Sequence, residues 1–123
     1  MIRLSNKRIL LCITGGIAAY KTAELTRLFK KNGAEVRIIM TQSAQEFVTP
    51  LTLQAVSGNQ IHYSLLDEEA ELGMGHIELA KWADVILIAP CTAESLARLA
   101  QGRANDLMSA VILASDAQLF IAP

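Results

Sequence analysis

Mostly apolar runs alternate along the chain with segments in which apolar and charged residues are mixed. Runs that are apolar at nearly every position are typical of strands buried on both faces of a parallel sheet. We predict such strands at 8–14, 35–40, 84–90 and 118–122, and a shorter one at 60–64.

The segments between these strands place apolar residues at three- and four-residue steps, which is typical of amphipathic helices. In the longest, 17–32, Lys30 and Lys31 suit the negative end of the helix dipole, and Asn32-Gly33 forms a left-handed stop. Thr41 or Ser43 is expected to cap a short helix at 41–47. Further helices are predicted at 50–56, 76–82, 93–101 and from a cap at Asn105 or Asp106 to 113. The stretch 66–75 has acids and glycines without a clear period and is predicted to be a mobile loop.

This order of strands and helices predicts an α/β fold, a doubly wound parallel sheet with right-handed crossovers. The length of 123 residues fits one domain, so we expect a single domain over 1–123.

The net charge of −1 gives no electrostatic reason to expect nucleic acid or an anionic membrane as partner. No apolar run approaches the ~20 residues that span a bilayer, and the first residues lack a signal-peptide layout, so we expect a cytoplasmic protein. Hydrophobic residues make up 52% of the chain, a surplus that usually ends in subunit contacts. Cys12 and Cys91 lie in or beside apolar runs without metal-ligand spacing, so no metal site is expected and Cys12 is assigned to the core.

Thr14-Gly15-Gly16 places two glycines at a strand-to-helix turn, at the sheet edge where such folds bind ligands. Glycine lets backbone N–H groups approach an anion at the positive end of a helix, which favours a phosphate. A tight turn without a ligand explains the glycine pair equally well at this point.

Two stronger phosphate motifs fail at this turn. The dinucleotide pattern GxGxxG needs glycine where Ile17 and Tyr20 stand. The triphosphate loop GxxxxGK[ST] also needs glycine at Tyr20, and no acidic residue follows the strand that ends near Ala89. A mononucleotide phosphate, held by backbone amides and the hydroxyls of Thr41 or Ser43, fits what remains.

His76 begins a predicted helix directly after a Gly-Met-Gly sequence. The positive end of the helix dipole favours the neutral imidazole, which can act as a base or hydrogen-bond partner. A plain surface histidine is an equally valid interpretation, and His62 is assigned to that ordinary class. Asn105 and Asp106 are explained as helix caps.

Five stretches resemble one family, the homo-oligomeric flavin-containing cysteine decarboxylases, and the resemblance covers nearly the whole chain. These stretches are 14–21, 40–41, 47–51, 75–84 and 104–107. The nearest branch is the one that converts phosphopantothenoylcysteine to phosphopantetheine in coenzyme A biosynthesis.

The resemblance implies a Rossmann-like, flavodoxin-type fold of three α/β/α layers, bound FMN, and a homotrimer or larger assembly. In this family the flavin oxidises the cysteinyl thiol, the thioaldehyde loses carbon dioxide, and the reduced flavin returns the electrons. The chain is therefore expected to carry out FMN-dependent decarboxylation of phosphopantothenoylcysteine.

The resemblance also assigns residues. His76 takes the place of the active-site histidine and Asn105 contacts the substrate. FMN contacts are assigned to Gly15, Gly16, Ile17, Ala18, Thr41, Ser43, Pro90, Thr92, Ala93 and Ser95. The family sequence Pro-Ala-Ser-Ala-Asn-Thr is altered here, with Glu94 replacing an amide by a charge. Cys91, in the same stretch, is not the family's catalytic cysteine.

The chain ends at Pro123, where the family's substrate-binding Pro-X-Met-Asn motif would begin, and its reducing cysteine lies further along still. Two interpretations fit an end at Pro123: the chain is a fragment, or it is a protein that keeps the flavin fold without completing the reaction. Two other functions stay open: a flavin prenyltransferase, against which the sequence around His76 argues, and a non-catalytic FMN-binding regulatory protein.

Overall fold

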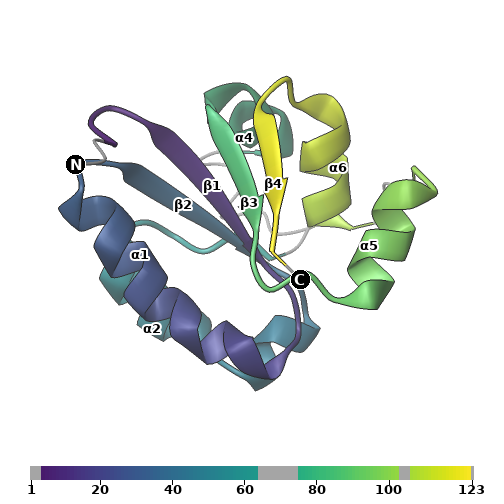
Figure 1. Ribbon diagram of the computed structural model, residues 1–123, viewed down its shortest axis with the longest axis horizontal. Helices are drawn as coiled ribbons and strands as arrows, with labels where there is room; N and C mark the ends of the chain where they lie inside the picture. The colour runs from purple at the N-terminus through teal and green to yellow at the C-terminus, as the bar shows by residue number, and fades with distance from the viewer. Residues whose placement is uncertain (1–3, 64–74, 103–105, 123) are drawn as a thin grey trace.

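The sheet has four parallel strands in the order β2-β1-β3-β4 (Figure 1). The computed structural model describes residues 4–63, 75–102 and 106–122. The strands are β1 Arg8–Ile13, β2 Glu35–Met40, β3 Val85–Ile88 and β4 Gln118–Ile121. The four longer strands are therefore confirmed. The short strand expected at 60–64 is reduced, in its described part, to one bridge between Ile39 and His62.

The helices follow the predicted order, but two of the predicted segments contain 3₁₀ helix in place of α-helix. The α-helices are α1 Thr22–Lys31, α2 Pro50–Ser57, α4 His76–Trp82, α5 Ala93–Ala100 and α6 Leu107–Ala114, with 3₁₀ helices η1 Ile17–Lys21 and η2 Ser43–Glu46. The single helix predicted at 17–32 is thus two, because Ala19 N–H donates to the C=O of Gly16 at 2.9 Å and tightens the first turn. The segment 41–47 is likewise a 3₁₀ turn and not an α-helix. The predicted loop 66–75 lies, apart from Gly75, outside the described residues.

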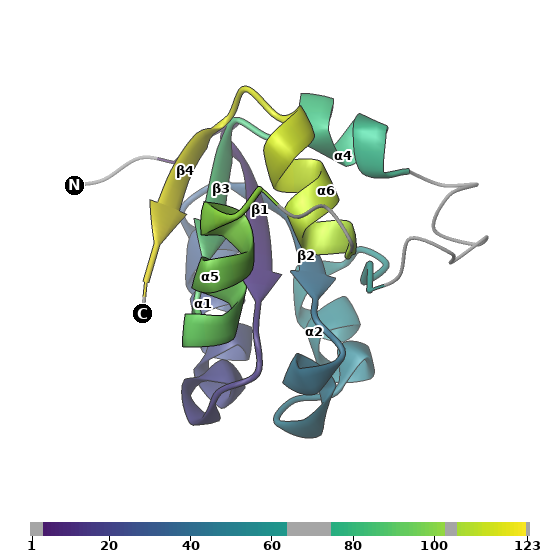
Figure 2. The same ribbon diagram turned by 90° about the vertical axis from the view of Figure 1, so that its right-hand side faces the viewer.

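Helices cover both faces of the sheet, as Figure 2 shows. Alternate residues of a strand point to opposite faces, so neighbours in β1 enter different cores. Leu11 packs with Leu53 of α2 on the side of α1 and α2. Leu10 packs with Ile86 and Met108 on the side of α4 and α6. The predicted α/β/α doubly wound fold is confirmed.

Strand β1 lies between β2 and β3, which both follow it in the sequence but pair with its two opposite edges. Its register pairs Arg8 with Glu35 of β2 and Ile9 with Val85 of β3. The chain therefore turns one way after β1 and the other way to reach β3, and such a reversal opens a crevice beyond the carboxyl ends of the strands.

Arg8 and Asp84 join the amino ends of β1 and β3. The backbone N–H of Arg8 donates to Asp84 Oδ2 at 2.9 Å, and the backbone N–H of Asp84 donates to the C=O of Arg8 at 2.9 Å. The Arg8 guanidinium adds a weaker contact at 3.5 Å. These contacts fix the start of the pairing between β1 and β3.

Side-chain and glycine caps set the helix ends, and the ends predicted at Gly58 and Asp106 are present. Thr49 Oγ1 accepts from the backbone N–H of Thr52 ahead of α2, and Gly58 ends that helix at φ 76°. Asp106 and Ser109 form a capping box at the start of α6. Within the described part of the chain, no helix is long and apolar enough to cross a membrane.

Candidate ligand-binding site

A cavity of about 730 Å³ lies beyond the carboxyl ends of β2 and β3, a volume that suits a small organic ligand. One side is formed by the residues that follow β2, and the other by the N-terminal parts of α5 and α6. The polar lining includes Thr41, Ser43, Thr92, Glu94, Arg98 and Asp106.

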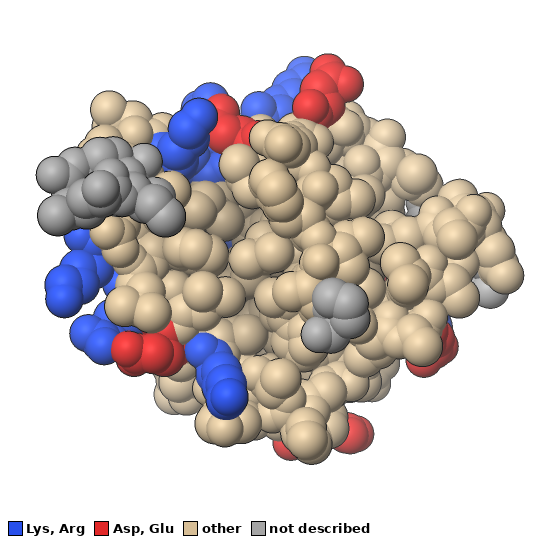
Figure 3. Space-filling model, viewed as in Figure 1, with Lys and Arg blue, Asp and Glu red and all other residues tan. Residues whose placement is uncertain are grey.

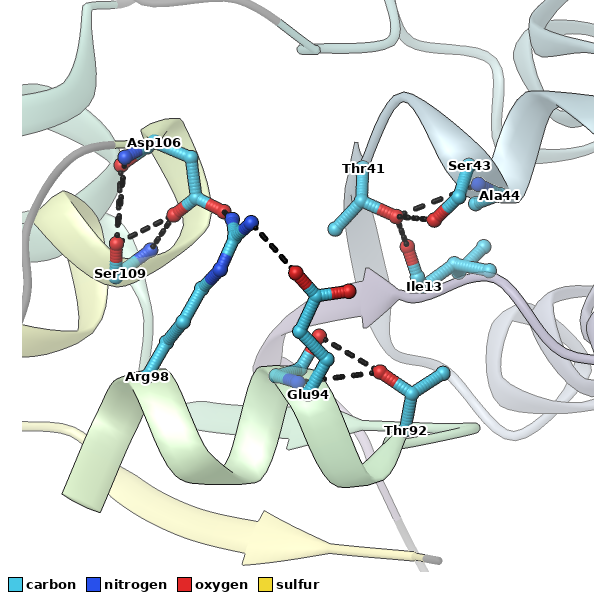
Figure 4. Close-up of polar contacts among 10 residues, drawn as sticks. Ile13, Thr41, Ser43, Ala44, Thr92, Glu94, Arg98, Asp106 and Ser109 are labelled. Atoms are coloured by element: carbon cyan, nitrogen blue, oxygen red, sulfur yellow. Dashed lines mark hydrogen bonds and ion pairs between the residues drawn. The ribbon is translucent and has the colours of Figure 1, made fainter. Parts of the chain in front are cut away.

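Hydroxyl groups line the cavity on the β2 side, where Thr41 and Ser43 face it (Figure 4). Thr41 Oγ1 lies 3.3 Å from Ser43 Oγ and accepts from the backbone N–H of Ala44 at 3.3 Å. At the start of α5, Thr92 Oγ1 donates to Ser95 Oγ at 3.0 Å. Both pairs present hydroxyls beside the strand ends, a donor set that suits a phosphate or a polar heterocycle.

The glycine turn lies directly behind the Thr41–Ser43 side of the cavity. A Cβ atom on Gly15 would lie 2.5 Å from Ser43 Oγ and 3.0 Å from the backbone carbon of Ser43. A Cβ atom on Gly16 would lie 3.6 Å from Pro90 Cγ, an ordinary contact. Only glycine at position 15 therefore lets the turn after β1 approach the chain after β2 this closely.

Thr14 joins the turn to the chain that follows β3. Its Oγ1 donates to the C=O of Pro90 and accepts from the backbone N–H of Thr92 at 3.0 Å. The ends of β1, β2 and β3 are thus connected through short side chains around one site.

An ionic cluster forms the opposite side of the cavity. Arg98 Nη2 lies 2.9 Å from Glu94 Oε1, and Arg98 Nη1 lies 3.3 Å from Asp106 Oδ2. The Asp106 carboxylate also accepts from the backbone N–H of Ser109 at 2.9 Å, through Oδ1. One carboxylate therefore caps α6 and holds the guanidinium of α5 (Figure 4).

The structure brings together part of the site expected from the sequence. Thr41, Ser43, Thr92 and Ser95 line the cavity. Gly15, Gly16 and Pro90 lie next to these residues without lining it. Ile17, Ala18 and Ala93 have exposed side chains outside the lining, and Asn105 lies outside the described residues.

His76 is not among the residues that line the cavity. It begins α4, a helix of seven residues and thus about 10 Å long, which leads into the amino end of β3. The residues that line the cavity, among them Thr41 and Thr92, instead follow the carboxyl ends of β2 and β3. Folding of one chain therefore does not place this histidine in its own cavity.

The ionic cluster is the part of the site that sequence reasoning missed. The sequence alone does not single out Arg98, gives Glu94 no role and explains Asp106 only as a cap. The spacing of Glu94 and Arg98 on a predicted helix was a usable signal, because oppositely charged residues four apart lie on one helix face.

Both cysteines are free thiols, and Cys12 is fully buried, which confirms its assignment to the core. Burial raises the pKa of Cys12 far above its usual value, and the nearby Asp106 and Cys91 raise it further. Burial also raises the pKa of Cys91. Neither sulfur is a ready nucleophile at neutral pH. Among the described residues, no group of three or more His, Cys, Asp or Glu side chains is placed to hold a metal ion.

A doubly wound parallel sheet with a glycine turn and hydroxyls at its carboxyl ends defines an α/β mononucleotide-binding protein. The model of the family described as Flavoprotein matches residues 2–123. The chain belongs to this flavoprotein family.

Similar proteins agree with this assignment. The chain is 62% identical to the coenzyme A biosynthesis bifunctional protein CoaBC of Haemophilus influenzae over 99% of its length, and spans 30% of that protein. The crystal structure of the FMN-dependent cysteine decarboxylase SpaF superposes with a TM-score of 0.86 at 30% identity, covering 96% of this chain and 68% of that one. A mutant PPC decarboxylase complexed with pantothenoylaminoethenethiol gives 0.78 at 34% identity, covering 94% and 65%.

Proposed function

We propose that the chain is a single FMN-binding domain that decarboxylates phosphopantothenoylcysteine to phosphopantetheine in the cytoplasm. The observation that carries this proposal is the cavity between the Thr41–Ser43 side and the N-terminus of α5, with Gly15 packed closely against Ser43. The similarity to CoaBC and to PPC decarboxylase supports the choice of substrate.

The residues around the cavity fit FMN. Gly15 lies close to Ser43, so the backbone amides of the glycine turn and the hydroxyls of Thr41 and Ser43 would hold the phosphate together. Pro90, Thr92 and Ser95 would contact the rest of the cofactor from the β3 side. Bound there, FMN supplies the two-electron oxidation that makes the carboxylate of a cysteine derivative easy to lose.

His76 has the role of a proton acceptor in this proposal. An imidazole nitrogen would take the proton of the substrate thiol, while Thr92 and Ser95 orient polar groups in the cavity. Because α4 lies away from the cavity of its own chain, we infer that a second copy brings His76 to it.

An assembly of identical subunits, a trimer or larger, is part of the same proposal. Ile17 is 82% exposed and Leu51 is 73% exposed, although both are large apolar residues. The three apolar residues of the edge strand β4, Leu119, Phe120 and Ile121, are exposed as well. Uncharged side chains dominate the middle of the face in Figure 3, with the charged ones gathered toward its rim. Such surfaces favour contact between subunits.

The test is to purify the chain with FMN and follow flavin absorbance through a sizing column. We expect flavin to elute with protein in a species larger than the 13.3 kDa monomer. Adding phosphopantothenoylcysteine without oxygen should then bleach the flavin. A colourless monomer would contradict the binding proposal, and a coloured protein that the substrate does not bleach would contradict the catalytic one.

A further inference from the structure

Arg98 is the one cationic side chain among the described residues that line the cavity. Glu46, Glu94 and Asp106 line it too, so three carboxylates against one guanidinium leave the lining with a net charge of −2. An anionic ligand would be repelled by this lining unless it paired with Arg98. The state of that guanidinium therefore decides whether an anion can bind.

The two partners of Arg98 differ in how firmly they are held. The Glu94 side chain is 76% exposed and pairs with Arg98 along one helix face, an arrangement that contributes little to stability. The Asp106 side chain is 29% exposed and is fixed by the capping box of α6. An entering anion can thus replace Glu94 without disturbing α6.

The guanidinium also has donors to spare. Arginine carries five N–H donors, and its fork matches the two oxygens of a carboxylate or phosphate. In the structure, Nη2 donates to Glu94 and Nη1 to Asp106. Release of Glu94 would direct Nη2 to a ligand while Nη1 keeps the side chain in place.

We propose that Arg98 binds an anionic group, carboxylate or phosphate, of the ligand in this cavity, exchanging Glu94 for that group while retaining Asp106. The inference rests on the proposed function only in taking the ligand to be anionic. FMN and phosphopantothenoylcysteine both qualify, and they can be separated by experiment. Glu94 is then a competitor for Arg98 that sets how tightly the anion binds.

The decisive comparison uses the two partners of the same ion pair. Arg98→Met should weaken anion binding by about tenfold or more, the usual effect of losing a hydrogen bond to a charged group. Glu94→Gln should tighten it severalfold, because the competitor and a repelling charge are both removed. Arg27→Met and Glu24→Gln are matched controls on an exposed pair of α1, and should change nothing.

Two measurements identify the source of the anion, and a third tests anion binding without flavin. Loss of FMN affinity in Arg98→Met, with riboflavin affinity unchanged, assigns the contact to the FMN phosphate; fluorescence quenching measures both. If Arg98→Met leaves FMN affinity unchanged but weakens the binding of phosphopantothenoylcysteine more than that of phosphopantetheine, the contact is with the substrate carboxylate. Calorimetry measures both ligands. The third probe needs no flavin: inorganic phosphate should raise the melting temperature of the unaltered chain more than that of Arg98→Met, against chloride at equal ionic strength.

Opposite effects of the two variants are the signature of an exchange. If Arg98→Met and Glu94→Gln weaken binding alike, or if Arg98→Met matches Arg27→Met with every probe, the inference is wrong. Arg98→Lys, which keeps the charge but loses the fork, should fall between Arg98→Met and the unaltered chain and shows that the cavity is still folded. If the unaltered chain binds no flavin, the proposed function fails, while the phosphate probe still decides the role of Arg98.

Discussion

Gly15 is the residue at which the chain after β1 comes closest to the chain after β2. The space for a side chain there is already occupied by the Ser43 side chain and its backbone carbon. Gly16, one residue on, has room for a methyl group beside Pro90. The two adjacent glycines therefore differ. Gly15 permits the close approach of two chain segments, whereas the space around Gly16 does not require glycine.

Gly15→Ala should push Ser43 and η2 away from the turn. We expect a loss of about 1–3 kcal/mol in the free energy of unfolding, as for other overpacked sites, and a large rise in the dissociation constant for FMN. Urea unfolding and flavin fluorescence measure the two effects. Gly16→Ala is the control and should cost much less stability. Equal costs for the two variants would contradict the account of Gly15.

At the scale of elements, Arg8 and Asp84 connect the start of β1 to the turn between α4 and β3. The backbone N–H of Arg8 is the main reason why the pKa of Asp84 is lowered, and the Arg8 side chain adds to the effect. A carboxylate with a lowered pKa stabilises the folded state above its unfolded pKa of about 3.9, and this contribution disappears as pH falls through the lower folded value.

Asp84→Asn should accordingly be less stable than the unaltered chain at pH 7, with the difference shrinking below about pH 4. Urea unfolding midpoints at pH 7 and pH 3 measure this. Arg8→Met keeps the backbone N–H and should preserve most of the pH dependence that Asp84 gives. A difference between Asp84→Asn and the unaltered chain that stays constant over this range would show that the carboxylate acts by packing alone.

Local patterns predict most elements, and the exceptions have physical causes. β2 at Glu35–Met40 and α4 at His76–Trp82 match the prediction at both ends, because apolar period and end signals coincide there. The 3₁₀ turn that divides 17–32 contains Ala19, which is fully buried in the same core cluster as Ile13, and no local pattern contains such a tertiary contact.

The same holds for the site: some of its residues can be predicted from local sequence patterns, and others only from the folded structure. Thr41 and Thr92 are hydroxyl residues directly after predicted strands, so sheet topology alone brings them together. The contact between Arg98 and Asp106 joins α5 to the N-cap of α6, and it exists only because the fold brings the start of α6 to the side chain of Arg98. Ion pairs of that kind require the packed structure.

At the scale of the whole molecule, the separation of His76 from the cavity makes the proposed activity a property of the assembly. If a second copy supplies the histidine, two variants with different defects can complete each other in a mixed oligomer. One variant keeps an intact cavity and the other keeps an intact histidine.

His76→Asn and a Thr41→Val, Ser43→Ala double variant should each be inactive alone. Refolded together, they should recover part of the rate at which phosphopantothenoylcysteine bleaches the flavin, because some intact cavities gain an intact histidine. Circular dichroism of each variant controls for folding. A mixture as inactive as its components would place the histidine and the cavity in the same chain.

The central position of β1 also has a consequence for how the protein is made. Its partner in β2 is close in sequence, with Arg8 opposite Glu35, whereas Ile9 must wait for Val85. On the ribosome, β1, α1 and β2 can associate while the other edge of β1 is still unpaired. That apolar edge is open to pairing with other nascent chains until β3 has been synthesised and a long loop has closed. The strand that leads into the glycine turn is thus also a strand exposed to aggregation during synthesis.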